Sequence, residues 1–201
     1  MSISLAERDR LEAAFDAAQR KTHAPIAGVL AHASESWDAE FLLGACLLAL
    51  LTPLPLLVFT DLSAHRIYIA QLLVAIVAAV IGALPQVRRL LIPKRARESA
   101  GHRAALAQFV LRGLDHSGCG VLVYVSLAEH YIRIVPAEDA ERAIPRERWQ
   151  EVVDEALGPL AAGETAAALE KLADRCADLL AGSFPPDPSW RPPQRHRFHV
   201  I

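Results

Sequence analysis

The chain has 201 residues, of which 53% are hydrophobic and 22% charged, and its net charge is −2. This length allows one domain, or one small domain with a membrane element, and the charge gives no indication of a nucleic-acid partner. The three cysteines, Cys46, Cys119 and Cys176, are far apart and odd in number. Their spacing excludes a CxxC metal motif and a disulfide framework, and it is typical of a reducing compartment.

The N-terminal segment, residues 1–36, predicts one helix and one strand. Ser4 and Glu7 have the spacing of a capping box, and apolar residues then follow at helical intervals. The segment is charged from its first residues, so it does not predict a signal peptide. A short strand is expected at 26–31. One helix and one strand cannot bury their own apolar surface, so we expect this segment to be part of a domain completed further along the chain.

Residues 37–97 predict a transmembrane α-helical hairpin, with spans near 40–60 and 67–87. The most apolar stretches, 41–59 and 67–84, contain no charged residue. The nineteen residues of the first stretch would cover roughly 28 Å at about 1.5 Å each, close to a hydrocarbon thickness of about 30 Å. The alternative, two buried core helices, would require a much larger soluble core.

The linker at 60–66 is so short that it can form only a tight reversal. Both chain termini are therefore expected on the same side of the membrane. The linker contains one basic residue, Arg66, whereas five follow the second span: Arg88, Arg89, Lys94, Arg95 and Arg97. The positive-inside rule therefore places both termini in the cytoplasm, with two spans in the inner membrane. Because neither apolar stretch, 41–59 or 67–84, contains a charged residue, a transporter or channel role is not expected. Small residues in the second span allow close packing within the hairpin or between copies in a homo-oligomer.

The C-terminal half predicts an α/β fold, a small sheet flanked by helices and interrupted by the membrane hairpin. An amphipathic helix opens the segment 98–184, and two helices close it. Between them, 120–126 is apolar almost throughout, as in a central strand, and 131–135 alternates like its antiparallel neighbour. We expect strand 26–31 to join this sheet, which makes the domain discontinuous. The proline-rich residues 185–201 predict a tail.

The order of these elements resembles the TPM domain family, and more narrowly a proteobacterial membrane form with two spans inside the domain. The likeness rests on Gly-Val-Leu-Val-Tyr-Val-Ser-Leu-Ala-Glu-His-Tyr-Ile-Arg-Ile at 120–134, on Trp149, and on Phe184-Pro185. It implies a small α/β fold. Relatives include thylakoid lumen proteins of photosystem II repair, one of which is described as an acid phosphatase. Bacterial members often occur beside LemA-type genes, which implies a membrane protein partner of that type or another TPM protein.

The sequence departs from this family at several polar positions near strand ends. Pro25 replaces a usual Glu, His130 replaces a usual Arg, and 136–140 replaces a turn containing Asp and Gly. Such positions are where a ligand or ion binds in an open α/β sheet. Their replacement weighs against an inherited enzymatic activity.

The candidate binding site is the polar cluster Ser126, Glu129 and His130, at the exit of the predicted central strand. These side chains either bind a ligand or partner, or close a polar hairpin turn. No Gly-rich phosphate loop, GxSxG or HExxH motif is present, so no catalytic residue, cofactor or metal site is predicted. His102, His116, His196 and His199 are each expected to be ordinary surface or partly buried histidines.

Two functions remain open from the sequence. The first, which we favour, is a non-enzymatic interaction or scaffold module tethered to the lipid bilayer. The alternative is a weak acid-phosphatase-like phosphomonoesterase. Convergence of Glu129 and other carboxylates on one concave site would discriminate between them.

Overall fold

The computed structural model describes residues 4–32, 38–84, 87, 92–128, 131–190 and 196–201. It divides into two compact units. The first combines Met1–Ser34 with Glu98–Ile201, and the second is Glu35–Arg97. The first unit is therefore built from two stretches of sequence that lie on either side of the second unit in the chain.

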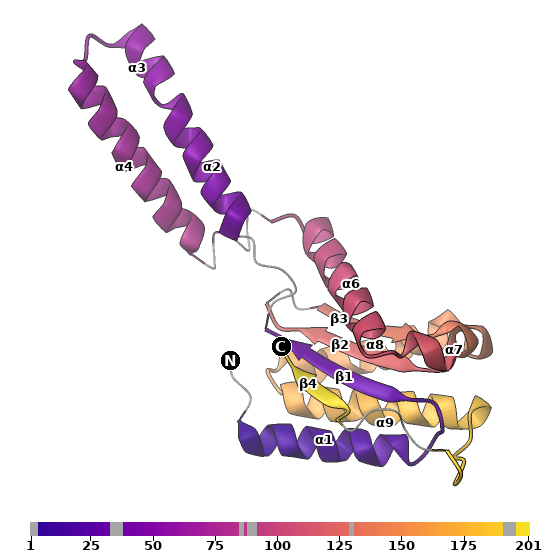
Figure 1. Cartoon of the computed structure of the whole chain (residues 1–201). Helices are drawn as coiled ribbons and strands as arrows, with labels where there is room; N and C mark the ends of the chain where they lie inside the picture. The colour runs from indigo at the N-terminus through magenta and orange to yellow at the C-terminus, as the bar shows by residue number, and fades with distance from the viewer. Residues whose placement is uncertain (1–3, 33–37, 85–86, 88–91, 129–130, 191–195) are drawn as a thin grey trace. The chain divides into compact units, whose positions relative to one another are not determined.

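The first unit contains a four-stranded mixed sheet (Figure 1). Its strands are β1 (Ile26–Ala31), β2 (Val121–Ser126), β3 (Tyr131–Pro136) and β4 (Phe198–Val200), in the order β3-β2-β1-β4. β1 is parallel to both of its neighbours, and β2 and β3 are antiparallel. The predictions that the first strand joins the later ones, and that the fold is a small α/β sheet flanked by helices, are confirmed.

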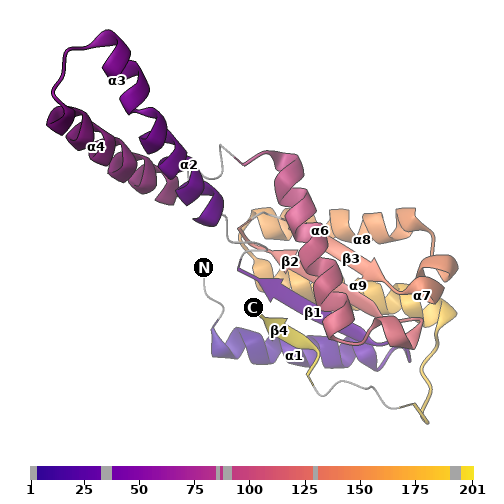
Figure 2. The same ribbon diagram turned by 45° about the horizontal axis from the view of Figure 1, so that its top comes forward.

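Helices cover both faces of this sheet (Figures 1 and 2). One face packs against α1 (Leu5–Gln19), α8 (Arg146–Ala161) and α9 (Thr165–Ser183), and the other against α6 (Lys94–Leu111). All residues of β1 and β2 are buried, because they are the two inner strands and are covered on both sides. Two short helices, η1 (Asp115–Ser117) and α7 (Glu138–Ala143), precede β2 and follow β3.

The helix α1 is fixed at its start and along one face. Its first turn has the predicted capping box, in which the Glu7 amide donates to Ser4 Oγ and the Ser4 amide donates to Glu7 Oε2. Leu11 and Phe15 are fully buried against the sheet. Lys21, just beyond the helix, donates to a carboxylate oxygen of Asp174 on α9 at 2.6 Å. This helix therefore belongs to the same core as the C-terminal helices.

The second unit consists of α2 (Asp38–Leu51), α3 (Pro53–Phe59) and α4 (Ala64–Ala83). Helices α2 and α4 pack against each other, and α2 gives way to α3 at Thr52, before Pro53. Two stretches, Ala39–Phe59 and Ala64–Ala83, are long and apolar enough to cross a membrane. Most of their large side chains are exposed, including Leu50 at 67% and Val80 at 59%.

The strand β4 lies in the segment that the sequence predicts only as a proline-rich tail. Phe198 is nearly fully buried and its ring stacks on Phe15 of α1, with centroids 5.7 Å apart. The Gly28 amide donates to the Arg197 carbonyl at 2.7 Å, which joins β4 to β1. The end of the chain is therefore part of the sheet.

Candidate functional site

A pocket of about 440 Å³ lies at the carboxyl ends of the parallel strands β1 and β2. Its lining comes from the residues that follow these strands and from the turn between α8 and α9: His32, Ser126, Leu127, Ala128, Leu160, Ala161, Gly163 and Thr165. The carboxyl ends of parallel strands are where open α/β sheets bind ligands. Ser126, the one residue of the predicted site that the structure describes, is among these lining residues.

The backbone after each strand holds the pocket together. The Leu127 amide donates to the Ala31 carbonyl, and the Ala128 amide donates to the His32 carbonyl, both at 3.0 Å. These bonds continue the ladder between β1 and β2 beyond the last paired residues, Ala31 and Ser126. His32 and the chain after Ser126 are therefore held side by side although 94 positions separate the two residues in sequence.

Ser126 lines this pocket but is fully buried. Along β2, Leu122 and Tyr124 belong to the core cluster beneath α6, and alternation places the Ser126 hydroxyl on that same face. The turn between α8 and α9 is on the opposite face. The serine hydroxyl is therefore not presented to the pocket. The other two predicted residues, Glu129 and His130, lie outside the described residues.

His32 is a residue that the sequence analysis does not single out. It follows the last residue of β1 and is exposed, so its imidazole can reach a ligand in the pocket. Its position directly after a buried strand is the sequence signal that could have identified it. On the far wall, α9 begins after Gly163, whose φ of 82° turns the chain. No side chain caps the start of α9, so its first amides face outward from the helix.

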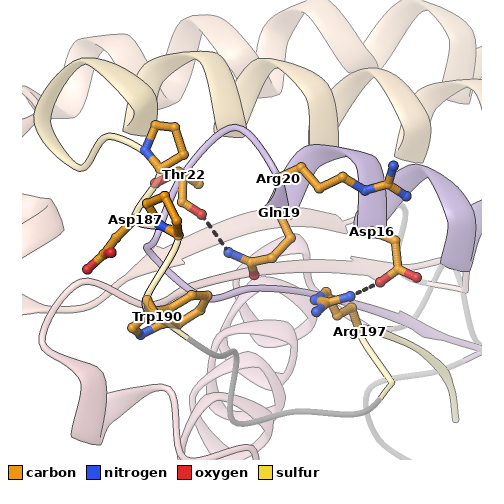
Figure 3. Close-up of a pocket in the computed structure, with 9 residues that line it drawn as sticks. Asp16, Gln19, Arg20, Thr22, Asp187, Trp190 and Arg197 are labelled. Carbon is orange, nitrogen blue, oxygen red and sulfur yellow. Dashed lines mark hydrogen bonds and ion pairs between the residues drawn. The ribbon is translucent and has the colours of Figure 1, made fainter.

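A second pocket, of about 410 Å³, lies between the end of α1 and the segment that follows α9 (Figure 3). Gln19 is buried there, and all its polar atoms are bonded: Nε2 donates to the carbonyls of Thr22 and Ala24, and Oε1 accepts from the Ile26 amide. Arg197 pairs with Asp16, and burial lowers the pKa of its guanidinium. These bonds fix the entry to β1, which indicates a structural role.

The four other histidines named from the sequence, His102, His116, His196 and His199, do not gather at one site among the described residues. His116 is exposed on η1, and His196 is exposed before β4. Burial lowers the pKa of His102 and of His199, and a nearby arginine adds to each effect: Arg133 for His102 and Arg112 for His199. Within residues that the structure describes, no group of three potential metal ligands occurs.

The cysteines of the first unit are poor nucleophiles. Cys176 is fully buried in α9, and this burial raises the pKa of its thiol to about 12. Cys119, before β2, is partly buried, which also raises its pKa. Because the thiolate is the reactive form, neither side chain supports thiol chemistry near neutral pH.

This fold and its strand-end pocket define a small α/β domain of the mixed-sheet type. Residues 85–179 match the family model described as the TPM domain. Residues 85–179 therefore correspond to a TPM domain, which confirms the resemblance to the TPM domain family.

A solved structure has the same fold. The NMR structure of the BA42 protein from the psychrophilic bacterium Bizionia argentinensis aligns with a TM-score of 0.62 at 12% identity. The alignment covers 100% of this chain and 97% of BA42. At this identity the likeness concerns the fold alone. A comparison with curated proteins found no match.

Proposed function

We propose that this protein is an integral membrane protein whose TPM domain binds a membrane protein partner at the cytoplasmic face of the inner membrane, without catalysing a reaction. The observation that carries the proposal is the pair of long apolar helices that interrupts the TPM-containing unit in sequence. A tether inserted inside a domain keeps that domain at the bilayer surface, where its partners are other membrane proteins.

The exposed surface of the hairpin supports its insertion in lipid. Leu43, Leu57 and Val80 expose 62%, 66% and 59% of their surface. An apolar surface this extensive is unfavourable in water and favourable in hydrocarbon. The first candidate span has 21 residues, which at about 1.5 Å each gives roughly 31 Å, the thickness of a bilayer core.

The orientation follows from charge. Between the two apolar stretches 41–59 and 67–84 the one arginine or lysine is Arg66, in the first turn of α4, whereas five arginines and lysines occur between positions 88 and 97. The positive-inside rule then places the TPM domain and both termini on the cytoplasmic side.

For the interaction role we propose the strand exit as the contact region, with Ser126, Glu129 and His130 contributing to it. The buried Ser126 would support the shape of this exit, and the exposed His32 would add a polar contact beside it. The partner proposed from the family resemblance is a LemA-type protein or another TPM protein, including a second copy of this chain.

The alternative function is a weak phosphomonoesterase, and one arrangement favours it. The exposed His32 and the start of α9, which no side chain caps, line the same pocket at the strand ends. Free amides at a helix start bind phosphate oxygens, and a histidine can transfer a proton near neutral pH.

Purification of the tagged full-length chain from native membranes, with mass spectrometry of what accompanies it, tests the first proposal. We expect the chain in the membrane fraction with a stoichiometric membrane protein. Glu129→Ala and His130→Ala should weaken recovery of that protein, whereas His116→Ala, at an exposed site on η1, should not. Recovery of the chain from the soluble fraction would contradict the proposal.

A phosphatase assay tests the alternative on the same preparation. We expect no hydrolysis of p-nitrophenyl phosphate above background, with or without divalent cations. Saturable hydrolysis that is lost in Glu129→Ala or His32→Ala would establish the enzyme in place of the interaction module.

A further inference from the structure

The two edges of the sheet differ in what accepts hydrogen bonds from the backbone amides that point away from the sheet. At the β4 edge, the amides of Arg197 and Phe198 donate to the two carboxylate oxygens of Glu12, at 2.8 and 2.9 Å. A side chain of α1 therefore occupies that edge. At the β3 edge, the part of the chain that the structure describes provides no further strand.

The register identifies which groups of β3 point outward. The Ala137 amide donates to the Gly120 carbonyl at 2.7 Å, so these opposed residues form a hydrogen-bonded pair. By alternation along the ladder, Arg133 and Val135 also bond to β2. The amides of Ile132 and Ile134 then point away from the sheet. Pro136 has no amide hydrogen and ends this outward row.

A groove of about 480 Å³ runs along this edge. Its floor is β3, one wall is provided by Arg146, Trp149, Gln150 and Val153 of α8, and Glu98 of α6 and Glu141 of α7 complete the lining. The outward row of β3 thus borders an open space whose α8 wall contains two apolar residues, Trp149 and Val153, beside two polar ones. Such an edge pairs readily with another extended chain.

Charge within the groove restricts what can pair there. Arg133 lies on the edge strand itself, with Nη1 3.4 Å from the Tyr131 hydroxyl, and no carboxylate among the described residues forms an ion pair with it. A side chain directly opposite on an added strand would lie about 5 Å from Arg133, measured between Cβ atoms. A carboxylate suits that position. Glu98 and Glu141 also line the groove, but they lie on the helices α6 and α7 and not on a strand beside Arg133.

A second copy of this chain is disfavoured at the same edge. The antiparallel register that pairs both outward amides sets Ile132 opposite Ile134 of the other copy. That register places Arg133 directly opposite its own equivalent, and like charges in opposed positions are destabilising. The edge is therefore better suited to a different chain of opposite charge.

We propose that the β3 edge binds an extended segment of a partner protein, added as a fifth strand with alternating apolar and acidic residues. Its amides and carbonyls pair with Ile132 and Ile134, its apolar side chains contact Trp149 and Val153, and a carboxylate faces Arg133. This inference deepens the proposed interaction function by assigning the partner's chemistry and its binding surface.

The test uses the full-length chain in lipid nanodiscs and three synthetic peptides. The probe is fluorescently labelled Thr-Val-Glu-Val-Glu-Val-Thr, blocked at both ends. A second peptide has lysine in place of both glutamates. A third has the sequence of the probe but carries N-methyl groups on the amides that would face β3. We expect saturable binding of the probe alone, because the third peptide cannot donate to the edge and the second carries the wrong charge.

Variants of the protein separate charge from backbone pairing. Arg133→Glu should weaken probe binding by about tenfold or more and should permit binding of the lysine peptide. Arg8→Glu, the same charge change at an exposed site on α1, should leave both affinities unchanged. The rescue by the lysine peptide distinguishes a direct contact from misfolding of the variant.

Amide hydrogen exchange gives a position-specific readout of strand addition. The amides of Ile132 and Ile134 should exchange about tenfold more slowly with the probe bound, whereas those of Arg133 and Val135, already bonded to β2, should not change. Equal binding of all three peptides, or no binding of the probe, overturns the inference. The membrane purification described above uses no peptide. The proposed tethered function therefore passes or fails that test independently of the peptide result.

Discussion

Glu12 and Phe198, 186 residues apart, are joined by a hydrogen bond of 2.9 Å from the Phe198 amide to Glu12 Oε2. The other oxygen of this carboxylate accepts from the Arg197 amide at 2.8 Å. A charged side chain of the first helix thereby holds the last strand against the sheet. The same contact covers the β4 edge of the sheet, whereas at the opposite edge, β3, the described residues add no further strand.

Glu12→Gln should destabilise the domain by about 2 kcal/mol, because a carboxylate that accepts two amide hydrogen bonds is replaced by a neutral amide that accepts weakly and on one side only. Urea unfolding of the full-length chain in nanodiscs measures this change. Asp9→Asn removes a charge at an exposed site on the same helix and should have little effect. Equal stability of the two variants would show that β4 is held by other contacts.

Gly28→Ala should destabilise the domain by about 1–3 kcal/mol through overpacking. A Cβ at position 28 would collide with the ring of Phe15, which is fully buried and stacked on Phe198. Gly158→Ala is the matched control, since nothing lies near its added methyl group and alanine favours the helix. The two midpoints in urea should therefore shift in opposite directions.

Replacement of residues 37–97 by a flexible Gly/Ser linker should give a soluble protein that unfolds cooperatively. Residues 98–201 alone should be much less stable, because β1 is an inner strand and its loss separates β4 from β2. Burial of Leu11, Phe15 and Val29 contributes on the order of 1.5–3 kcal/mol each, against about 5–15 kcal/mol for a whole domain. Calorimetry of both proteins decides the matter, and equal stability would mean that the two segments fold independently.

Single cysteines test the proposed membrane orientation, in a chain whose three native cysteines have been replaced. Cysteines at Ser63, between the candidate spans, or at Ala64, the first residue of the second one, should react with an impermeant thiol reagent in intact spheroplasts. Cysteines at Ser2 or Ser183 should react only after the membrane is opened. The reverse pattern would place the TPM domain on the outer side.

Acid should destabilise the first unit partly through His199. Burial, then Arg112, lowers the pKa of this imidazole from 6.5, while the His196 carbonyl and Glu12 oppose that shift. Because the pKa is lower in the folded state, the unfolded chain binds more protons below about pH 6.5, so stability present above that pH is lost as the pH falls. His199→Asn should reduce the loss of stability between about pH 7 and pH 5, measured by urea unfolding. His116→Asn, at an exposed position, should not.

Much of the fold follows from local sequence patterns. Three features can be recognised from short stretches of sequence, each no longer than one helix or strand. They are the capping box at Ser4 and Glu7, the apolar run of β2 and the two long apolar helices. These signals also predict that strand 26–31 joins the later strands, since its segment cannot bury its own surface. β4 was not predictable in this way, because three residues after a proline-rich stretch carry no periodicity.

The candidate site was predicted less completely, for a physical reason. The sequence places Ser126 at the end of a buried strand, which the structure bears out, but only the pairing of β1 with β2 brings His32 beside it. The direction of the Ser126 hydroxyl, toward the α6 face, also depends on which helix covers which face. Glu129 and His130 lie outside the described residues and stay a prediction.

Most elements of this protein, though not β4, follow from its sequence alone, because helical and strand periodicity, caps and apolar length are local properties of the chain. Which distant segments meet follows only from the tertiary structure: Glu12 meets the amides of β4, His32 meets the exit of β2, and β3 and β4 are the edge strands of the described sheet. Such contacts depend on long-range pairing of the backbone, whose register and neighbours are set by packing over the whole domain and leave no local signal.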